Sequence, residues 1–279
     1  VFLSPTASTA RMAGISRHVF RLHPSATREA AKMGAFAAHD LGLETVAILA
    51  PKNRFALDLV DAFREPFEDD GERGGRVVEV VRYVPTPGAV PRAVDRALSG
   101  SVGGGARSQG VYLAAPEADP AAREVLRELA RRDYRGAVLA TSAFAARRVL
   151  NQIGNQVGRG AEGLLLPRSG FDPESEAPEV REFVEAYRQE YGEDPTPGAA
   201  YGYDAVMVLA RALEDQGPVP YQLWQGVRGL SDYAGVTGPI RFDERGEVGR
   251  FPRVYVVRRG ELERVRALDE RARNRLARL

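Results

Sequence analysis

The 279-residue sequence contains no cysteine, which excludes disulfides, thiolate nucleophiles and zinc sites with thiolate ligands. Histidine is also scarce, since His18, His23 and His39 are the only ones. None of them has a second histidine or a carboxylate at a metal-ligand spacing such as His-Glu-x-x-His. We therefore predict a structural role for each histidine, no metal site and no cofactor.

The common catalytic motifs are missing as well. The sequence has no Gly-x-Ser-x-Gly nucleophile elbow, and no Gly-x-Gly-x-x-Gly opens a helix after a strand. The glycine-rich stretch 99–110 lacks the Lys-Ser/Thr ending of a phosphate-binding loop, so we interpret it as a surface loop. Asp69 and Asp70 lie in a polar stretch next to glycines, which favours a solvated turn over acid-base catalysis. A hydrolase on an α/β scaffold is disfavoured because no nucleophile-base pair is visible. We predict that the protein is not an enzyme.

No apolar run approaches the roughly 18 residues needed to cross a bilayer, so we predict that the chain does not span a membrane. Charge of either sign is not in excess: 39 basic and 38 acidic residues give a formal net charge of +1. The overall charge therefore indicates no nucleic-acid partner. A hydrophobic content of 44% is enough for one large core or two smaller ones.

Apolar strand-like runs alternate with helix-period segments over the first 170 residues. This rhythm is typical of parallel βα units, and it predicts an α/β fold with parallel sheets flanked by helices. The predicted strands are Val19–Leu22, Thr45–Ala50, Arg76–Val84, Gly110–Ala115, Gly136–Ala140 and Glu162–Leu166.

After Leu166 the pattern changes to one helix after another. We predict helices at 179–191, 198–214 and 221–227, then a strand around Ile240 that ends in the turn Asp243–Gly246. A last strand follows at Val254–Val257, and the spacing of apolar residues in 264–279 predicts an amphipathic tail helix.

Four segments in this order carry a resemblance to a known family: Leu3-Ser-Pro-Thr-Ala-Ser-Thr9, Val19-Phe-Arg-Leu22, Tyr201-Gly-Tyr-Asp-Ala205, and Gly235-Val-Thr-Gly-Pro-Ile-Arg-Phe-Asp243. The chain resembles type I periplasmic solute-binding proteins of the branched-chain amino-acid receptor branch. The resemblance covers essentially the whole chain and implies a two-lobe fold. It also implies that lobe one is incomplete, with further βα units expected ahead of the Ser-Pro loop.

The resemblance divides the chain into segments. Residues 1–22 would end the first segment of lobe one, and 23–170 would form lobe two. Residues 171–245 would return to lobe one, and 246–279 would hold the final strands and the tail helix.

The resemblance also implies ligand-binding residues. The loop with Ser4, Thr6, Ser8 and Thr9 corresponds to the family loop that wraps an anionic ligand group with hydroxyls and backbone N–H groups, where a following helix N-terminus would add a favourable dipole. The other implied ligand residues are Phe55 as an apolar or stacking wall, Asp119 and Ser142 from lobe two, and Tyr201, for which a role in the core is the alternative.

Two departures from the family pattern bear on the ligand. Phe55-Ala56 stands where relatives offer Tyr-Gly, and the loop 141–144 stands where relatives supply a carboxylate to the ligand's ammonium. A buried ammonium without a counter-charge is costly. We therefore expect that an ordinary α-amino acid is not the ligand unless Asp119 or Glu117 turns inward.

The function that the resemblance implies is an extracytoplasmic receptor of an ABC transporter. It would be periplasmic or extracellular, and a preceding N-terminal segment would carry any lipid anchor. It would close two lobes around an amino acid or a related carboxylate or amide and deliver it to a permease. The alternative is an envelope lipoprotein of the penicillin-binding-protein-activator type, whose partner would be a peptidoglycan synthase.

Overall fold

The chain folds into two compact units, which the computed structural model describes over residues 1–69, 74–86, 88–99, 108–116, 118–157, 161–168, 170–231, 233–250 and 252–266. Unit 1 consists of Val1–Ser25 and Ser169–Pro252. Unit 2 consists of Ala26–Arg168 and Arg253–Leu279. Each unit is thus built from chain segments that are distant in the sequence.

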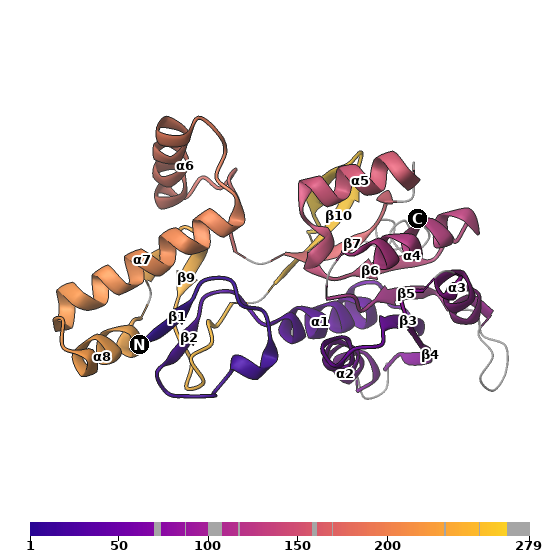
Figure 1. Cartoon of the computed structure of the whole chain (residues 1–279), viewed down its shortest axis with the longest axis horizontal. Helices are drawn as coiled ribbons and strands as arrows, with labels where there is room; N and C mark the ends of the chain where they lie inside the picture. The colour runs from indigo at the N-terminus through magenta and orange to yellow at the C-terminus, as the bar shows by residue number, and fades with distance from the viewer. Residues whose placement is uncertain are drawn as a thin grey trace. The chain divides into compact units, whose positions relative to one another are not determined.

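Unit 2 is built on one seven-stranded sheet, with strand order β11-β10-β7-β6-β5-β3-β4. The strands β3 to β7 pair in parallel, whereas β10 is antiparallel to β7 and β11 is antiparallel to β10 (Figure 1). The strands are β3 (Thr45–Pro51), β4 (Arg76–Tyr83), β5 (Gly110–Leu113), β6 (Ala137–Ala140), β7 (Leu165–Arg168), β10 (Arg253–Arg258) and β11 (Glu261–Arg264).

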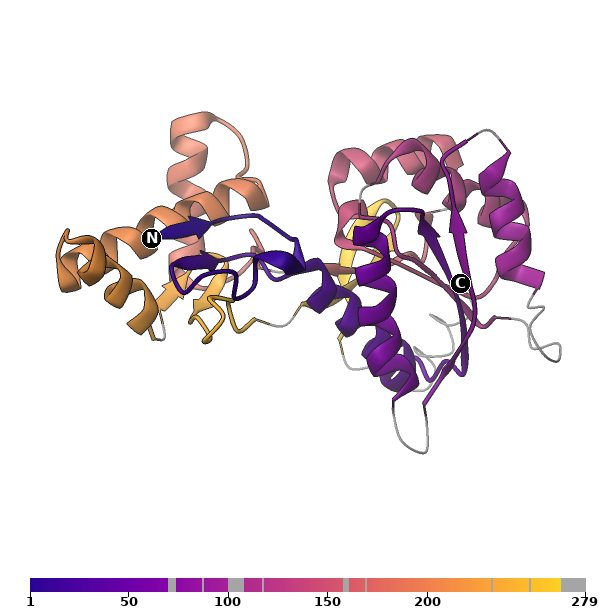
Figure 2. The same ribbon diagram turned by 60° about the horizontal axis from the view of Figure 1, so that its bottom comes forward.

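Helices cover both faces of this sheet. The helices are α1 (Ala26–Ala35), α2 (Arg54–Glu68), α3 (Ala89–Ser99), α4 (Pro120–Arg131) and α5 (Arg147–Val157). One core cluster packs α1 and α2 on one face, and a second packs α3, α4 and α5 on the other. Figure 2 shows α1 and α2, in indigo and purple, beside the strands of the sheet. The prediction of parallel βα units is confirmed.

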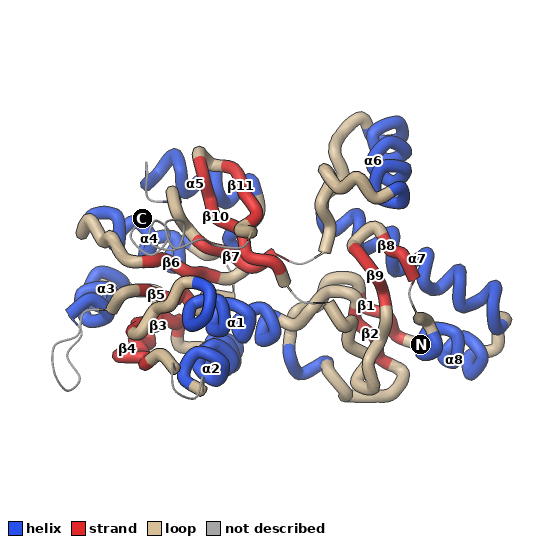
Figure 3. Tube along the Cα trace, turned by 180° about the vertical axis from the view of Figure 1, so that it is seen from behind, coloured by secondary structure: helices blue, strands red, loops and turns tan. Residues whose placement is uncertain are grey.

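Unit 1 has short strands and long helices. The strands β1 (Phe2–Ser4) and β2 (Val19–Arg21) pair in parallel, and β8 (Tyr233–Gly235) and β9 (Gly238–Ile240) form an antiparallel hairpin. The connection between β1 and β2 is mostly loop, tan in Figure 3, and contains the 3-10 helix η1 (Ala10–Met12). The helices are α6 (Pro178–Tyr191), α7 (Pro197–Gln216) and α8 (Pro220–Gly229).

Three local predictions need correction. The strand β7 begins at Leu165 rather than Glu162, because 161–163 form a turn. Arg264 ends the strand β11 and does not begin a helix, since it pairs with Tyr255 across the β10-β11 hairpin. The rest of the predicted tail helix, from residue 267 onward, lies outside the described residues.

The third correction concerns the loop 4–9, where a helix dipole was expected. The element that follows is η1, a single 3-10 turn of three residues. So short an element sums too few peptide dipoles to act as an anion site.

Candidate functional site

Three predicted ligand residues of unit 2 follow the carboxyl ends of three neighbouring strands. Phe55 comes after β3, Asp119 after β5 and Ser142 after β6, and these strands are adjacent and parallel in the sheet. The chain order of the strands reverses beside β3, which pairs with β4 on one side and β5 on the other. Open α/β sheets bind ligands outside the carboxyl ends of their strands at such a switch point.

Phe55 and Asp119 each lie at the start of a helix at this edge. Phe55 is the second residue of α2, whose cap Asn53 accepts a hydrogen bond from the Ala56 N–H at 2.7 Å, and its ring packs partly against the core. Asp119 caps α4 by accepting from the Ala122 N–H at 2.7 Å. Burial, with the charge of Asp119 as the smaller cause, raises the pKa of Tyr83.

Ser142 is the first residue of the short 3-10 helix η4 (Ser142–Phe144) and is partly exposed. Its hydroxyl donates a hydrogen bond to the carboxylate of Glu29, which lies in the first turn of α1 and is only 2% exposed. The neighbouring hydroxyl of Thr141 donates to the Ala115 carbonyl at 2.6 Å. Both hydroxyls of this loop therefore direct their protons inward.

Glu29 also acts on Tyr112, a fully buried residue of β5 whose ring stacks on Phe63 with 4.2 Å between centroids. Burial raises the pKa of Tyr112, and the charge of Glu29 adds to the effect. Among the described residues, no group lies within hydrogen-bonding distance of the Tyr112 hydroxyl. The edge near β5 and β6 thus includes the carboxylate of Glu29, which comes from α1 and not from the loop 141–144.

In unit 1, the loop 4–9 is held by hydrogen bonds to its own backbone. The Ser4 hydroxyl accepts from the Ala7 N–H at 3.2 Å. Arg21, which is 1% exposed, donates from Nη1 to the carbonyls of Ala7 at 3.4 Å and Thr9 at 2.5 Å, and from Nη2 to both oxygens of the Glu247 carboxylate. The buried guanidinium therefore orients the loop backbone.

The remaining hydroxyls of this loop face water to different degrees. Thr6 is exposed, whereas Ser8 and Thr9 are partly buried. Thr9 precedes η1, but its side chain makes no capping hydrogen bond. The Ser4 hydroxyl therefore supports the loop, and Thr6 is the exposed hydroxyl residue of this loop.

Tyr201 lies inside unit 1 on α7 and is 1% exposed. Its ring centroid is 5.1 Å from that of His23, and a Cβ added at Gly170 would lie 2.2 Å from its hydroxyl oxygen. The Nδ1 of His23 donates to the Pro24 carbonyl at 2.7 Å, and burial lowers the pKa of this histidine. Tyr201 thus packs as a core residue of unit 1.

Sequence reasoning missed Glu29, although a signal was present. Met33 and Ala37, both buried, follow Glu29 at four-residue spacings, so the carboxylate lies on the core-facing side of α1. Glu117, the other acidic residue considered, lies outside the described residues.

A surface hollow of about 420 Å³ lies in unit 1, lined by residues of α7, α8 and the segment that leads into β8. Its lining includes none of the predicted ligand residues. Within the described ranges, no group of three or more acidic, histidine or cysteine residues is placed to hold a metal ion. No helix in those ranges is both long and apolar enough to cross a membrane.

The model of the periplasmic binding protein family matches residues 1–261, so this chain belongs to the periplasmic binding protein family. A comparison with curated proteins gave no match.

Solved structures show the same relationship. A putative branched-chain amino acid ABC transporter protein from Rhodospirillum rubrum is 30% identical, with a TM-score of 0.76, and the match covers 94% of this chain and 72% of the other. An ABC transporter substrate-binding protein from Desulfitobacterium hafniense in complex with Leu is 28% identical, with a TM-score of 0.76 over 95% of this chain and 73% of the other. The leucine-binding protein LivK from Thermotoga maritima is 24% identical and shares the fold, with a TM-score of 0.77 over 96% of this chain and 73% of the other.

Proposed function

We propose that this chain is the substrate-binding protein of a branched-chain-amino-acid-type ABC transporter. The observation that carries the proposal is the gathering of Phe55, Asp119 and Ser142 at the carboxyl ends of three adjacent strands, in a chain whose family match spans residues 1–261. The ligand is a small polar molecule, either an amino acid or a related carboxylate or amide. Its direct partner is a transporter permease, and the protein acts outside the cytoplasm without catalysing a reaction.

The mechanism that we propose is hinge closure. The chain passes between the units after Ser25, Arg168 and Pro252, so a few backbone dihedral angles in these segments can change the orientation of the units. A ligand that contacts both units has a higher affinity for the closed state and shifts the population toward it. Thr6 and Ser8 of unit 1 and Ser142 of unit 2 are the side chains that we propose for the ligand, with Ser4, Thr9, Phe55 and Asp119 shaping their surroundings. Tyr201 packs in the core of unit 1 and is not part of this proposal.

We had expected that an α-amino acid is not the ligand, because the loop 141–144 offers no carboxylate to its ammonium. The loop 141–144 itself has no carboxylate, but Glu29 brings one to Ser142. A ligand ammonium in this region would therefore meet negative charge, and α-amino acids return to the list of candidate ligands.

A thermal-shift panel of L-amino acids, amides and short carboxylates on the full chain tests the proposal. A ligand at a free concentration of 100 times its dissociation constant stabilises the native state by about 2.7 kcal/mol, which raises the melting temperature measurably. We expect a shift with at least one ligand. No shift with any member of the panel would argue against a solute receptor.

The alternative is an envelope lipoprotein that acts through protein contacts, and the phenylalanine at position 55, which lacks a hydroxyl, favours it. Recovery of a peptidoglycan synthase in a pull-down from envelope extracts, together with a flat thermal-shift panel, would support this alternative.

A further inference from the structure

The helix α7, drawn in orange in Figure 1, is apolar on two opposite sides. One side packs into the core of unit 1 through residues such as Val208 and Ala212. The opposite side carries Tyr203, Val206 and Leu213, which are 41%, 65% and 42% exposed. Their spacings of three and seven residues place these three side chains on one stripe of the helix. Helices that are apolar all round are normally buried all round, so the outer stripe is suited to a further partner.

A row of aromatic rings extends this stripe onto α6. The ring centroid of Tyr203 lies 4.8 Å from that of Phe183, which lies 5.8 Å from that of Tyr187. The ring of Tyr191 continues the row at 4.5 Å from Tyr187, and this last residue of α6 is 64% exposed. The exposed members, Tyr191, Tyr203, Val206 and Leu213, are named here the α6–α7 surface. Apolar surface of this kind on a soluble protein indicates an interaction site.

The α6–α7 surface lies in a strongly acidic part of the chain. Residues 172–216 include 12 acidic and 3 basic residues, a formal net charge of −9, although the whole chain has a net charge of +1. Two of the three basic side chains are already in ion pairs with carboxylates of the same segment. Exposed carboxylates also adjoin the surface, since Glu190 precedes Tyr191 and Glu214 follows Leu213. The electrostatic potential around the surface is therefore negative.

This charge decides which kind of partner fits. A membrane with anionic lipids would be repelled, and so would the same surface of a second copy of this chain. A basic partner would be attracted, and its apolar side chains would pack on the stripe. An amphipathic helix has both properties when lysine or arginine borders its apolar face. The ridges of such a helix fit between the side chains of α7, which are spaced as on any helix surface.

We propose that the α6–α7 surface is a docking site for a basic amphipathic helix of a protein partner. The apolar stripe supplies the contact area, and the acidic surroundings select the partner by its charge. The proposal goes beyond the receptor function, because it does not depend on which solute the protein binds.

The test uses a fluorescein-labelled helical peptide of about 18 residues, with leucine along one face and lysine on the other. A second peptide has glutamate in place of lysine and the same leucine face. The full chain is titrated into each peptide, and binding is followed by fluorescence anisotropy. We expect the lysine peptide to bind at least about tenfold more tightly than the glutamate peptide at low salt, and we expect its affinity to fall as the salt concentration rises.

A double variant tests the apolar stripe. Val206→Gln with Leu213→Gln removes apolar contact area without changing the charge, and glutamine is a good helix former. We expect this variant to bind the lysine peptide about tenfold more weakly than wild type. The matched control is Phe2→Gln with Ile15→Gln, because these side chains are 58% and 70% exposed in the same unit but lie outside 172–216. The control should bind the peptide as wild type does.

A second double variant tests the charge. Glu190→Gln with Glu214→Gln keeps the apolar stripe and removes two of the carboxylates that adjoin it. We expect weaker binding of the lysine peptide and a smaller dependence of its affinity on salt. Because all four substituted residues of the two variants are exposed, circular dichroism should show the wild-type helix content in both.

Failure of the lysine peptide to bind, equal binding of the two peptides, or wild-type affinity in the Val206→Gln Leu213→Gln variant would overturn the docking site. Self-association in sedimentation that this variant abolishes would also overturn it, because the occupant would then be a second copy. If a natural form of the protein with a longer N-terminus does not bind the lysine peptide, its own residues cover the surface and the proposal is wrong. The receptor function is tested separately by the thermal-shift panel and stands in each of these cases.

Discussion

The carboxylate of Asp204 accepts hydrogen bonds from both the backbone N–H of Thr237, at 2.9 Å, and the hydroxyl of the same residue. It also accepts from the Val236 N–H at 2.8 Å. Asp204 is fully buried on α7, and Val236 and Thr237 form the turn of the β8-β9 hairpin. One buried side chain thus joins the segments Tyr201–Ala205 and Gly235–Asp243, two of those that carry the family resemblance.

Removing the Asp204 carboxylate should destabilise unit 1. Asp204→Ala leaves two backbone N–H groups buried without their acceptor, and each such group costs about 1 to 3 kcal/mol. We expect a loss of about 3 kcal/mol in the free energy of unfolding, measured by urea denaturation. Thr237→Val, which removes only the hydroxyl contact, should cost less. Equal losses in the two variants would contradict this account.

The pH dependence of Asp204 has a defined sign. Burial raises the pKa of this carboxyl, while its hydrogen bonds lower it by less. Between the unfolded pKa of about 3.9 and the raised folded value, the native state binds more protons than the unfolded state, so this contribution to stability is lost as the pH rises. The advantage of wild type over Asp204→Asn should therefore shrink as the pH rises from about 4. An advantage that grows with pH in urea unfolding would refute the assignment.

Arg21 and Glu247 form a buried ion pair, with side chains 1% and 9% exposed. Arg21→Met leaves the Glu247 charge uncompensated, and breaking a buried pair in this way costs about 3 to 5 kcal/mol. Arg188→Met is the matched control, because its pair with Asp194 is 55% and 71% exposed and such pairs contribute at most about 1 kcal/mol. Adding Glu247→Leu to Arg21→Met should restore part of the loss in urea unfolding. A control variant as unstable as Arg21→Met would contradict the prediction.

Gly246 and Gly192 separate two effects of a glycine substitution. Both have a left-handed backbone, with φ of +75° and +71°, but a Cβ at Gly246 would lie 2.1 Å from the Val19 carbonyl oxygen, whereas nothing lies within 4 Å at Gly192. Gly192→Ala should cost about 1 to 2 kcal/mol from backbone strain alone. Gly246→Ala should cost clearly more, because β2 must also move, and thermal denaturation can compare the two. Similar melting temperatures would show that the backbone at Val19 can move aside at little cost in free energy.

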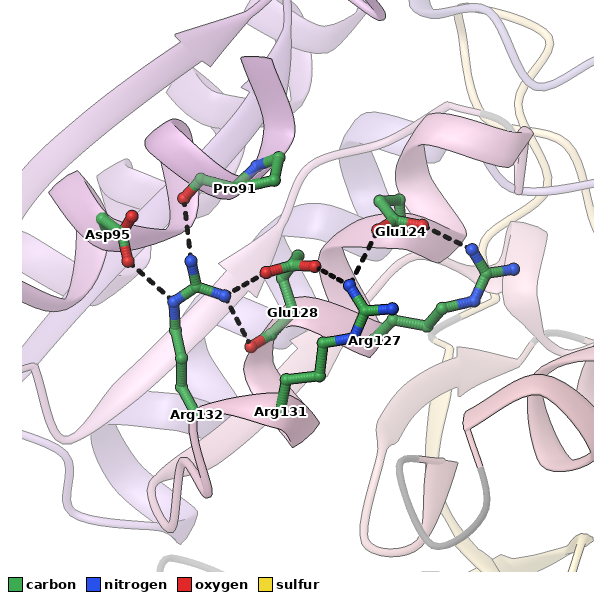
Figure 4. Close-up of polar contacts among 7 residues, drawn as sticks. All are labelled: Pro91, Asp95, Glu124, Arg127, Glu128, Arg131 and Arg132. Carbon is green, nitrogen blue, oxygen red and sulfur yellow. Dashed lines mark hydrogen bonds and ion pairs between the residues drawn. The ribbon is translucent and has the colours of Figure 1, made fainter. Parts of the chain in front are cut away.

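Glu128 should contribute stability that disappears in acid. The hydrogen bond from Arg132 is the largest cause that lowers the pKa of this carboxyl, and Arg131 adds to it (Figure 4). A carboxyl with a lowered folded pKa stabilises the native state above its unfolded pKa of about 4.3 and loses that contribution as the pH falls through the folded value. Glu128→Gln should therefore cost about 1.5 kcal/mol at neutral pH and progressively less below about pH 4. A cost that does not change with pH would contradict this.

Local patterns were sufficient for much of unit 2. The apolar run Val46–Ala50 predicts a buried strand, and the structure places all five residues of this run at 0% exposure in β3. The later pairing of β10 with β7 was not predictable, because nothing in the sequence of either strand specifies a partner almost 90 residues away. The order of the strands along the chain therefore did not indicate that β10 and β11 form an antiparallel edge of the sheet.

In the candidate site, too, one residue was predicted from the sequence and another was identified only in the structure. Ser142 was predicted from the family resemblance of its loop and from the place of that loop after a strand, and this prediction remains untested. Its partner Glu29 lies 113 residues earlier in the sequence. A carboxylate on the core-facing side of a helix is an exception to the usual burial pattern. Its role therefore depends on what the fold places opposite it.

The sequence by itself determined the family, the alternation of strands and helices, and the absence of thiol chemistry, because these depend on residue types and on spacings of two to four residues. Only the tertiary structure decided which carboxylate meets Ser142, which backbone groups Arg21 and Asp204 hold, and where β10 pairs. These relationships join groups at least 12 residues apart in the sequence, and 113 apart for Glu29 and Ser142, and they depend on how helices and strands pack together in three dimensions.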